Sequence, residues 1–314
     1  MKIFNSYLSG IKSASKLKKM ATLIYGVTFL STLVLAIPFH SILSTQAGHS
    51  MALDSLLKHF DYTMYTDFMR IYGKAITPFI FSAFWMGVFY LLFTIFFTGG
   101  VLNILSGEEM KFSIKNFLDG CGKFFFRYLR LAIYIGIIEL IIFLIVIMPA
   151  SMIIAAAYET VQSEAALFYM FVASAIVFAF LFILVLMIGD YAKIILFKDD
   201  SKKSLKSVWT STKFVFRHFF GAYSLYLLLL NAPVLFFVIY FLLENSIGMV
   251  SGFSIFIMFL IQQIFIWLRI FVKIWFLGSE IKFFEFNPRK EYKVIDTSIE
   301  QSAEPNSQGL IENI

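Results

Sequence analysis

Six long apolar stretches constrain this chain more than any other feature of its sequence. They cover residues 21–43, 77–105, 130–156, 166–197, 219–243 and 251–278. A helix needs about 20 mainly apolar residues to cross the hydrocarbon core of a bilayer, and each stretch meets that length. The sequence therefore predicts an all-α integral membrane bundle of six transmembrane helices. The fourth stretch is long enough to tilt or to extend beyond the bilayer at one end.

The composition agrees with this class. Of the 314 residues, 60% are hydrophobic and 15% are charged, whereas soluble domains carry roughly 25% charged residues. The single cysteine, Cys121, excludes an intramolecular disulfide and a CxxC metal site. The first apolar stretch is too long for the core of a cleaved signal peptide, so we interpret it as an uncleaved span.

Lysine and arginine are distributed asymmetrically between the connections. They cluster before the first span and in the 2–3 and 4–5 connections, whereas the 3–4 and 5–6 connections contain neither. Cytoplasmic loops carry such an excess of basic residues. The pattern predicts that both termini are cytoplasmic. Topology and attraction to anionic lipids explain the net charge of +6. No nucleic-acid module is recognisable, so we expect no nucleic-acid partner.

The chain divides into three expected parts. Residues 1–20 form a cytoplasmic interfacial amphipathic helix, residues 21–285 a six-helix transmembrane domain, and residues 286–314 a polar, disordered cytoplasmic tail. Within the domain, apolar residues recur at helical spacing in segment 44–76. We expect an external amphipathic helix there, lying on the outer surface or capping the bundle.

The sequence also contains an internal repeat. Lys123-Phe-Phe-Phe-Arg127 recurs 90 residues later as Lys213-Phe-Val-Phe-Arg217. The same offset superposes two glycines at the ends of even spans, a third follows at nearly the same interval, and each odd span contains one proline. These positions, expected to act as hinges of the repeat, are Gly99, Gly189, Gly278, Pro38, Pro149 and Pro233. The pattern predicts three helical hairpins with kinking prolines and with glycines at helix stops or close crossings.

A short basic and aromatic segment precedes each odd span. The three segments are residues 7–12, 117–123 and 208–213. We expect them to be interfacial helices on the inner leaflet.

Ionisable residues inside spans are the first candidates for function in a membrane protein. Glu139 lies nine residues beyond Arg130, and Arg269 lies nine residues before Gly278, so both are about 13 Å from the same side. They could form an ion pair between spans 3 and 6. Such a pair would fix helix register or line a path for a polar substrate or a proton; snorkelling without pairing is the third reading.

Other polar residues in the spans have simpler expected roles. The secondary positions are Asp190, Lys193, Asn231 and Lys273. The two lysines are expected to snorkel toward the interface. Asn231, together with Gln262 and Gln263, is expected to hydrogen-bond neighbouring helices.

No motif in the sequence predicts catalysis. The GxSxG, Walker A, HExxH, GxGxxG and DxDxDG patterns are missing. His40, His49 and His59 occur near Asp54, Asp61 and Asp67, but their spacings match no tight zinc motif. The sequence therefore predicts no enzyme activity, no cofactor and no metal.

Three segments carry a resemblance to known proteins: Phe97-Thr-Gly-Gly-Val-Leu102, residues 117–130, and Phe60-Asp-Tyr-Thr63. In these segments the chain resembles uncharacterised bacterial six-span membrane proteins akin to the membrane domain fused to some glycerophosphodiester phosphodiesterases. The resemblance implies a six-span fold, and with it we expect the chain in a bacterial inner membrane. No phosphodiesterase domain is present, so the resemblance does not imply that activity.

Two functions are expected from the sequence. The first is a non-catalytic envelope scaffold or accessory protein, whose partners are the bilayer, anionic lipids at the cytoplasmic face and another membrane protein. The alternative is a transporter or channel for a small solute or lipid, with Glu139 and Arg269 near the pathway.

Overall fold

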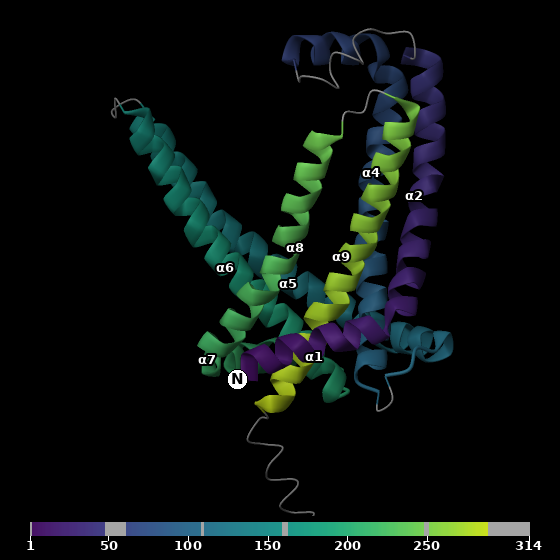
Figure 1. Ribbon diagram of the computed structural model, residues 1–314. Helices are drawn as coiled ribbons and strands as arrows, with labels where there is room; N and C mark the ends of the chain where they lie inside the picture. The colour runs from purple at the N-terminus through teal and green to yellow at the C-terminus, as the bar shows by residue number, and fades with distance from the viewer. Residues whose placement is uncertain (1, 48–60, 108–109, 159–162, 248–250, 288–314) are drawn as a thin grey trace, which may run out of the picture. The chain divides into compact units, whose positions relative to one another are not determined.

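The computed structural model describes residues 2–47, 61–107, 110–158, 163–247 and 251–287. Of these residues, 93% are helical and none is in a strand. The eight helices in this part of the chain are α1 (Lys2–Lys16), α2 (Lys18–Ala47), α4 (Tyr62–Leu105), α5 (Ile114–Tyr158), α6 (Glu164–Lys198), α7 (Ser204–Arg217), α8 (Phe219–Ser246) and α9 (Gly252–Phe286), all drawn in Figure 1.

Six of these helices are long and apolar enough to cross a membrane, namely α2, α4, α5, α6, α8 and α9. No more than 22% of the residues in the most apolar stretch of each is buried inside the protein. Soluble proteins rarely expose apolar patches larger than a few hundred Å², so surfaces of this kind fit a bilayer. The predicted all-helical chain with six spans of membrane-crossing length and composition is confirmed.

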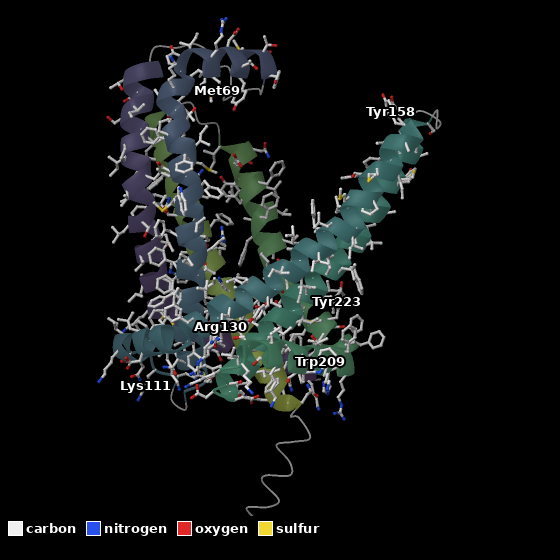
Figure 2. The ribbon with its side chains drawn as sticks, turned by 180° about the vertical axis from the view of Figure 1, so that it is seen from behind. Met69, Lys111, Arg130, Tyr158, Trp209 and Tyr223 are labelled. Atoms are coloured by element: carbon white, nitrogen blue, oxygen red, sulfur yellow. The ribbon has the colours of Figure 1, made fainter. Side chains whose placement is uncertain are left out.

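Two of these helices begin well before the spans expected from the sequence. The helix α4 starts at Tyr62 and α5 at Ile114, rather than near residues 77 and 130. Figure 2 shows that the first part of α4, which carries Met69, lies across the direction of the rest of that helix. Asp61 caps it, because the Oδ1 atom accepts hydrogen bonds from the backbone N–H groups of Thr63 (2.8 Å) and Met64 (3.1 Å).

Two sequence predictions fall partly outside the described residues. Residues 48–60 of the expected external segment and residues 288–314 of the expected tail are not described. The described ends of the external segment are helical, since α2 runs to Ala47 and α4 starts at Tyr62. Phe286, expected in the tail, is the last residue of α9.

The prolines and glycines of the repeat all lie inside helices. Pro38, Pro149 and Pro233 are interior residues of α2, α5 and α8, each of which continues past its proline. The repeat glycines lie within α4, α6 and α9, so the helix stop expected as one of their two roles does not occur. The other expected role, a close crossing, fits their surroundings.

The chain forms two compact units. Unit 1 contains Met1–Ala14, Arg130–Leu235 and Trp275–Ile314. In this unit α5 and α6 lie side by side as a hairpin (Figure 1), and the rings of Phe143 and Phe178 are 5.9 Å apart. Figure 2 shows Tyr158 at one end of this hairpin and Trp209 of α7 at the other. The hydroxyl of Ser211 in α7 donates a buried hydrogen bond of 2.6 Å to the carbonyl of Ile188 in α6.

Unit 2 contains Ser15–Leu129 and Phe236–Ile274. The helices α2 and α4 run side by side in it (Figure 1). Polar side chains of α9 bond to α2: Gln263 Oε1 accepts from Tyr25 Oη at 2.9 Å, and Trp267 Nε1 donates to Thr22 Oγ1 at 3.1 Å. Such interhelical hydrogen bonds stabilise helix contacts where apolar burial contributes little.

Candidate functional site

The candidate site of unit 1 is a group of ionisable side chains on four helices. We call it the charge cluster and define it as Glu139 of α5, Asp190 and Lys193 of α6, Tyr226 of α8 and Glu280 of α9. Electrostatic interactions connect all five, since the charges of Glu139, Asp190 and Glu280 affect both Lys193 and Tyr226.

Local structure places the α6 members of the cluster on one helix face. Asp190 and Lys193 are three residues apart, and residues at this spacing are neighbours on a helix surface. The preceding Gly189 faces Ile135 of α5, because a methyl group added to Gly189 would lie 3.3 Å from Ile135 Cγ1. The α5–α6 crossing is therefore close beside the cluster.

A close crossing also fixes the backbone next to Glu280. A methyl group on Gly10 of α1 would lie 2.7 Å from the backbone nitrogen of Ser279 in α9. The Trp275 indole donates to the Tyr7 carbonyl at 3.1 Å, one turn before the crossing on α9. The first helix of the chain thus holds the segment of α9 that carries Glu280.

Asp190 is the best satisfied carboxylate of the cluster. Lys193 Nζ lies 2.7 Å from Asp190 Oδ1, and the Tyr226 hydroxyl donates to Asp190 Oδ2 at 3.3 Å. Both carboxylate oxygens of Asp190 therefore have hydrogen-bond partners, and the bond from Lys193 is charge-assisted. The Lys193 and Asp190 side chains are 31% and 20% exposed, so this pair is the least buried side of the cluster.

Glu280 is the carboxylate of the cluster with the fewest hydrogen bonds. It is 1% exposed, and neither of its carboxylate oxygens has a hydrogen-bond partner among the described residues. The charges of Asp190 and Lys193 act on it. Glu139 Oε1 likewise has no hydrogen-bond partner in the described part of the chain, although Lys193 and Asp190 act on it too.

The pair expected from the sequence, Glu139 and Arg269, is divided between the two units. Arg269 belongs to unit 2, where a guanidinium nitrogen donates to the Tyr90 hydroxyl of α4 at 2.9 Å and the group lies 5.6 Å from the ring centroid. Glu139 belongs to the charge cluster of unit 1. Because the residues lie in different units, their pairing stays a prediction.

The secondary polar positions have different surroundings. Asp190 and Lys193 come together as described above, whereas Asn231 Nδ2 donates to the carbonyl of Leu227 in its own helix at 2.9 Å. Lys273 is exposed on α9. Of the two glutamines, Gln262 Nε2 donates to the Tyr240 hydroxyl of α8 at 3.3 Å, and Gln263 bonds to α2.

Sequence reasoning missed Glu280 and Tyr226. The span was expected to end at Gly278, so Glu280 was the first ionisable residue outside it. Its burial depends on α1, whose contact residues lie about 270 positions away. A signal was nonetheless present, because the small residues Gly278 and Ser279 precede Glu280 and predict a close helix contact there.

The arrangement can hold charge but does not suit a metal ion. No group of three or more histidine, cysteine, aspartate or glutamate residues in the described ranges could hold a metal ion. A partly exposed ion pair beside a buried carboxyl group without hydrogen bonds is typical of proton-linked sites and of structural networks. Comparison of the chain with protein-family models, curated proteins and solved structures gives no match.

Proposed function

We propose that the chain is a multi-pass protein of the bacterial inner membrane with both termini in the cytoplasm. The support is the asymmetry of Lys and Arg between the connections of the six apolar helices. The basic helices α1 and α7 and the start of α5 then lie at the cytoplasmic surface.

We further propose that the six spans are three repeats of a basic interfacial helix followed by a hairpin. Equivalent positions in the interfacial helices support it: Leu8, Leu118 and Trp209 are exposed, and three residues after Tyr7, Phe117 and Val208 come the buried Gly10, Gly120 and Ser211. The repeated KFxFR motif agrees, since Phe124 and Phe214 are buried whereas Phe126 and Phe216 are exposed.

Each interfacial helix also packs on the end of an even span through small residues. Methyl groups on Gly99 and Gly100 of α4 would lie 2.6 Å from the carbonyl oxygens of Gly120 and Phe117 in α5. Ser211 of α7 bonds to α6 next to Gly189, and Gly10 of α1 faces Gly278 and Ser279 of α9. The same kind of contact at three places favours a repeated unit.

From these features we propose a non-catalytic function, in which the protein is a scaffold or accessory protein of the envelope. One observation carries this: each interfacial helix packs through small residues on its buried side and exposes large apolar residues together with lysines. In α7 the exposed side chains include Leu205, Trp209 and Phe216, and Lys213 Nζ lies 5.3 Å from the Trp209 ring centroid. Such a face binds anionic lipid headgroups and is a surface for a membrane protein partner.

Thermal unfolding in lipid nanodiscs tests the lipid part of this proposal. Anionic lipid should raise the melting temperature of the wild-type protein above its value in zwitterionic lipid. The triple variant Lys206→Gln, Lys213→Gln, Arg217→Gln should lose much of that rise, because each basic residue near an anionic surface contributes about 1 kcal/mol. Lys74→Gln, in the segment expected on the external side, is the control and should keep it. An equal melting temperature in both lipids would refute the proposal.

The charge cluster supports a second function, a transporter or channel for a small solute or lipid. A transport pathway needs water access to its polar residues. A Glu139→Cys variant in a Cys121→Ala background should then react with a small water-soluble thiol reagent in intact membranes. A cysteine at Leu140, which is exposed on the same helix, is the control for a lipid-facing position. No reaction at position 139 would count against transport past the cluster.

A further inference from the structure

The charge cluster contains more carboxylates than its cation can balance. Three carboxyl groups, on Glu139, Asp190 and Glu280, act on one ammonium group, that of Lys193. Lys193 is committed to Asp190 at 2.7 Å. If every group were ionised, the cluster would hold a net charge of about −2, and the full cost of an unpaired buried ion, several kcal/mol, would fall on Glu280.

Among the described residues, Glu280 lacks hydrogen bonds that would stabilise an anion, and the one positive charge that acts on it, that of Lys193, is already bonded to Asp190. Glu280 is 1% exposed, and both carboxylate oxygens are without hydrogen-bond partners in the described residues. A buried anion in a folded protein is normally paired or hydrogen-bonded, and otherwise the group is neutralised. A cation must therefore accompany this carboxylate.

The proton is the cation that fits. A metal ion needs several ligands, and no metal-holding group of three acidic, histidine or cysteine side chains exists in the described ranges. A proton needs one oxygen and no added space. We propose that Glu280 is a proton-binding site, holding a dissociable proton beside the Asp190–Lys193 ion pair.

The groups that act on Glu280 come from two helices besides its own. On α6 these are Asp190, Tyr191 and Lys193, and on α8 it is Tyr226. Tyr191 Oη is buried and unpartnered among the described residues. Glu139 of α5 reaches the cluster through Lys193 and Tyr226. Among the described residues, Lys193 is the cation that acts on Glu280, so the carboxylate to which Lys193 bonds decides whether Glu280 keeps its proton.

This arrangement makes the proton of Glu280 depend on Asp190. With Asp190 ionised, the ammonium group of Lys193 is bonded to Asp190 and the proton stays on Glu280. Removing the charge of Asp190 frees Lys193 to neutralise Glu280, which then releases its proton through the partly exposed Asp190–Lys193 side. The site would thus exchange protons on the side of the cluster where Asp190 and Lys193 are partly exposed.

Infrared spectroscopy of the purified full-length protein in nanodiscs tests this directly. A protonated carboxylic acid has a carbonyl stretch that a carboxylate lacks. We expect this band at neutral pH in the wild-type protein, shifted by carbon-13 labelling of glutamate, and absent in Glu280→Gln. It should also be absent in Asp190→Asn, in which residue 280 is unchanged. If Glu280→Gln fails to fold, the isotope shift and Asp190→Asn still give the answer.

The controls are Glu285→Gln and Glu139→Gln, which should both keep the band. Glu285 lies on the same helix but is bonded to Lys198 at 3.1 Å and Lys282 at 2.8 Å, so it needs no proton. A wild-type protein without the band at neutral pH would overturn the proposal. So would a band that Glu139→Gln removes, or one that survives in Asp190→Asn. These results are independent of the lipid experiment, so either proposal can fail alone.

Discussion

At the scale of single residues, the interfacial helices depend on side chains that are small enough for close approach. Three crossings bring backbone to within contact distance of a glycine or serine, and a larger residue has no space there. The sequence allowed these glycines to be found, but their two possible roles, helix stop and close crossing, could not be separated. The choice depends on which helix lies opposite, and that is a tertiary property.

Gly100→Ala tests one of these crossings. The added methyl group would lie 2.6 Å from Cys121 Sγ and from the Phe117 carbonyl oxygen. Overpacking of this kind costs about 1–3 kcal/mol, so we expect a lower melting temperature in detergent. Gly122→Ala is the matched control, because nothing lies within 4 Å of an added methyl group and alanine favours a helix by about 1 kcal/mol. Equal melting temperatures for the two variants would contradict the crossing.

The ion pair of the charge cluster has its own residue-level test. Lys193→Met leaves Asp190 with only the Tyr226 hydroxyl, and we expect a loss of about 1.5–3 kcal/mol, the range for hydrogen bonds to charged groups. Adding Asp190→Asn removes the orphaned charge and should recover a large part of the loss. Melting temperatures of the two single variants and the double variant give the coupling. Additive effects would mean that the two side chains do not act as a pair.

At the scale of elements, the sequence predicted the existence of the spans better than their ends. Hydropathy marks where a helix becomes apolar, but a helix continues until its backbone is interrupted. The helices α4 and α5 therefore include polar and amphipathic turns before their apolar stretches, from Tyr62 and Ile114 onward. Asp61 marks the true start of α4 by its capping bonds, a signal that lies 16 residues before the expected span.

The contact between α2 and α9 gives a prediction for helix pairing. Tyr25→Phe removes the donor to Gln263 Oε1, a bond of 2.9 Å. Interhelical side-chain hydrogen bonds in membrane proteins average about 0.6 kcal/mol, so the expected loss is small. Gln263→Leu should cost a similar amount, and the double variant should cost no more than either single variant. Chemical unfolding in mixed micelles is the measurement, and a loss of several kcal/mol would mean that this bond has a larger role.

At the scale of the whole molecule, the asymmetry of Lys and Arg predicts that both termini are cytoplasmic. Chemical labelling can check this topology. In a Cys121→Ala background, cysteines at Lys111 and Lys202 should react with an impermeant thiol reagent only when the cytoplasmic side is open. Cysteines at Ser163 and Ser246 should react from the outside of intact cells. Helices α5 and α6, and α8 and α9, are connected through the segments that carry Ser163 and Ser246. Labelling of all four positions from one side would refute the proposed orientation.

The contact between the two ends of the described chain has a consequence for biosynthesis. Lys2 Nζ donates to the Phe286 carbonyl at 3.1 Å, across 284 positions. At roughly 5–20 residues per second, the ribosome needs about 15–60 s to make that interval. During this time α1 is complete but has no partner for its face of small residues. The first helix to be made is therefore among the last to pack against its partner, α9. Glu280 is enclosed only when synthesis is nearly finished.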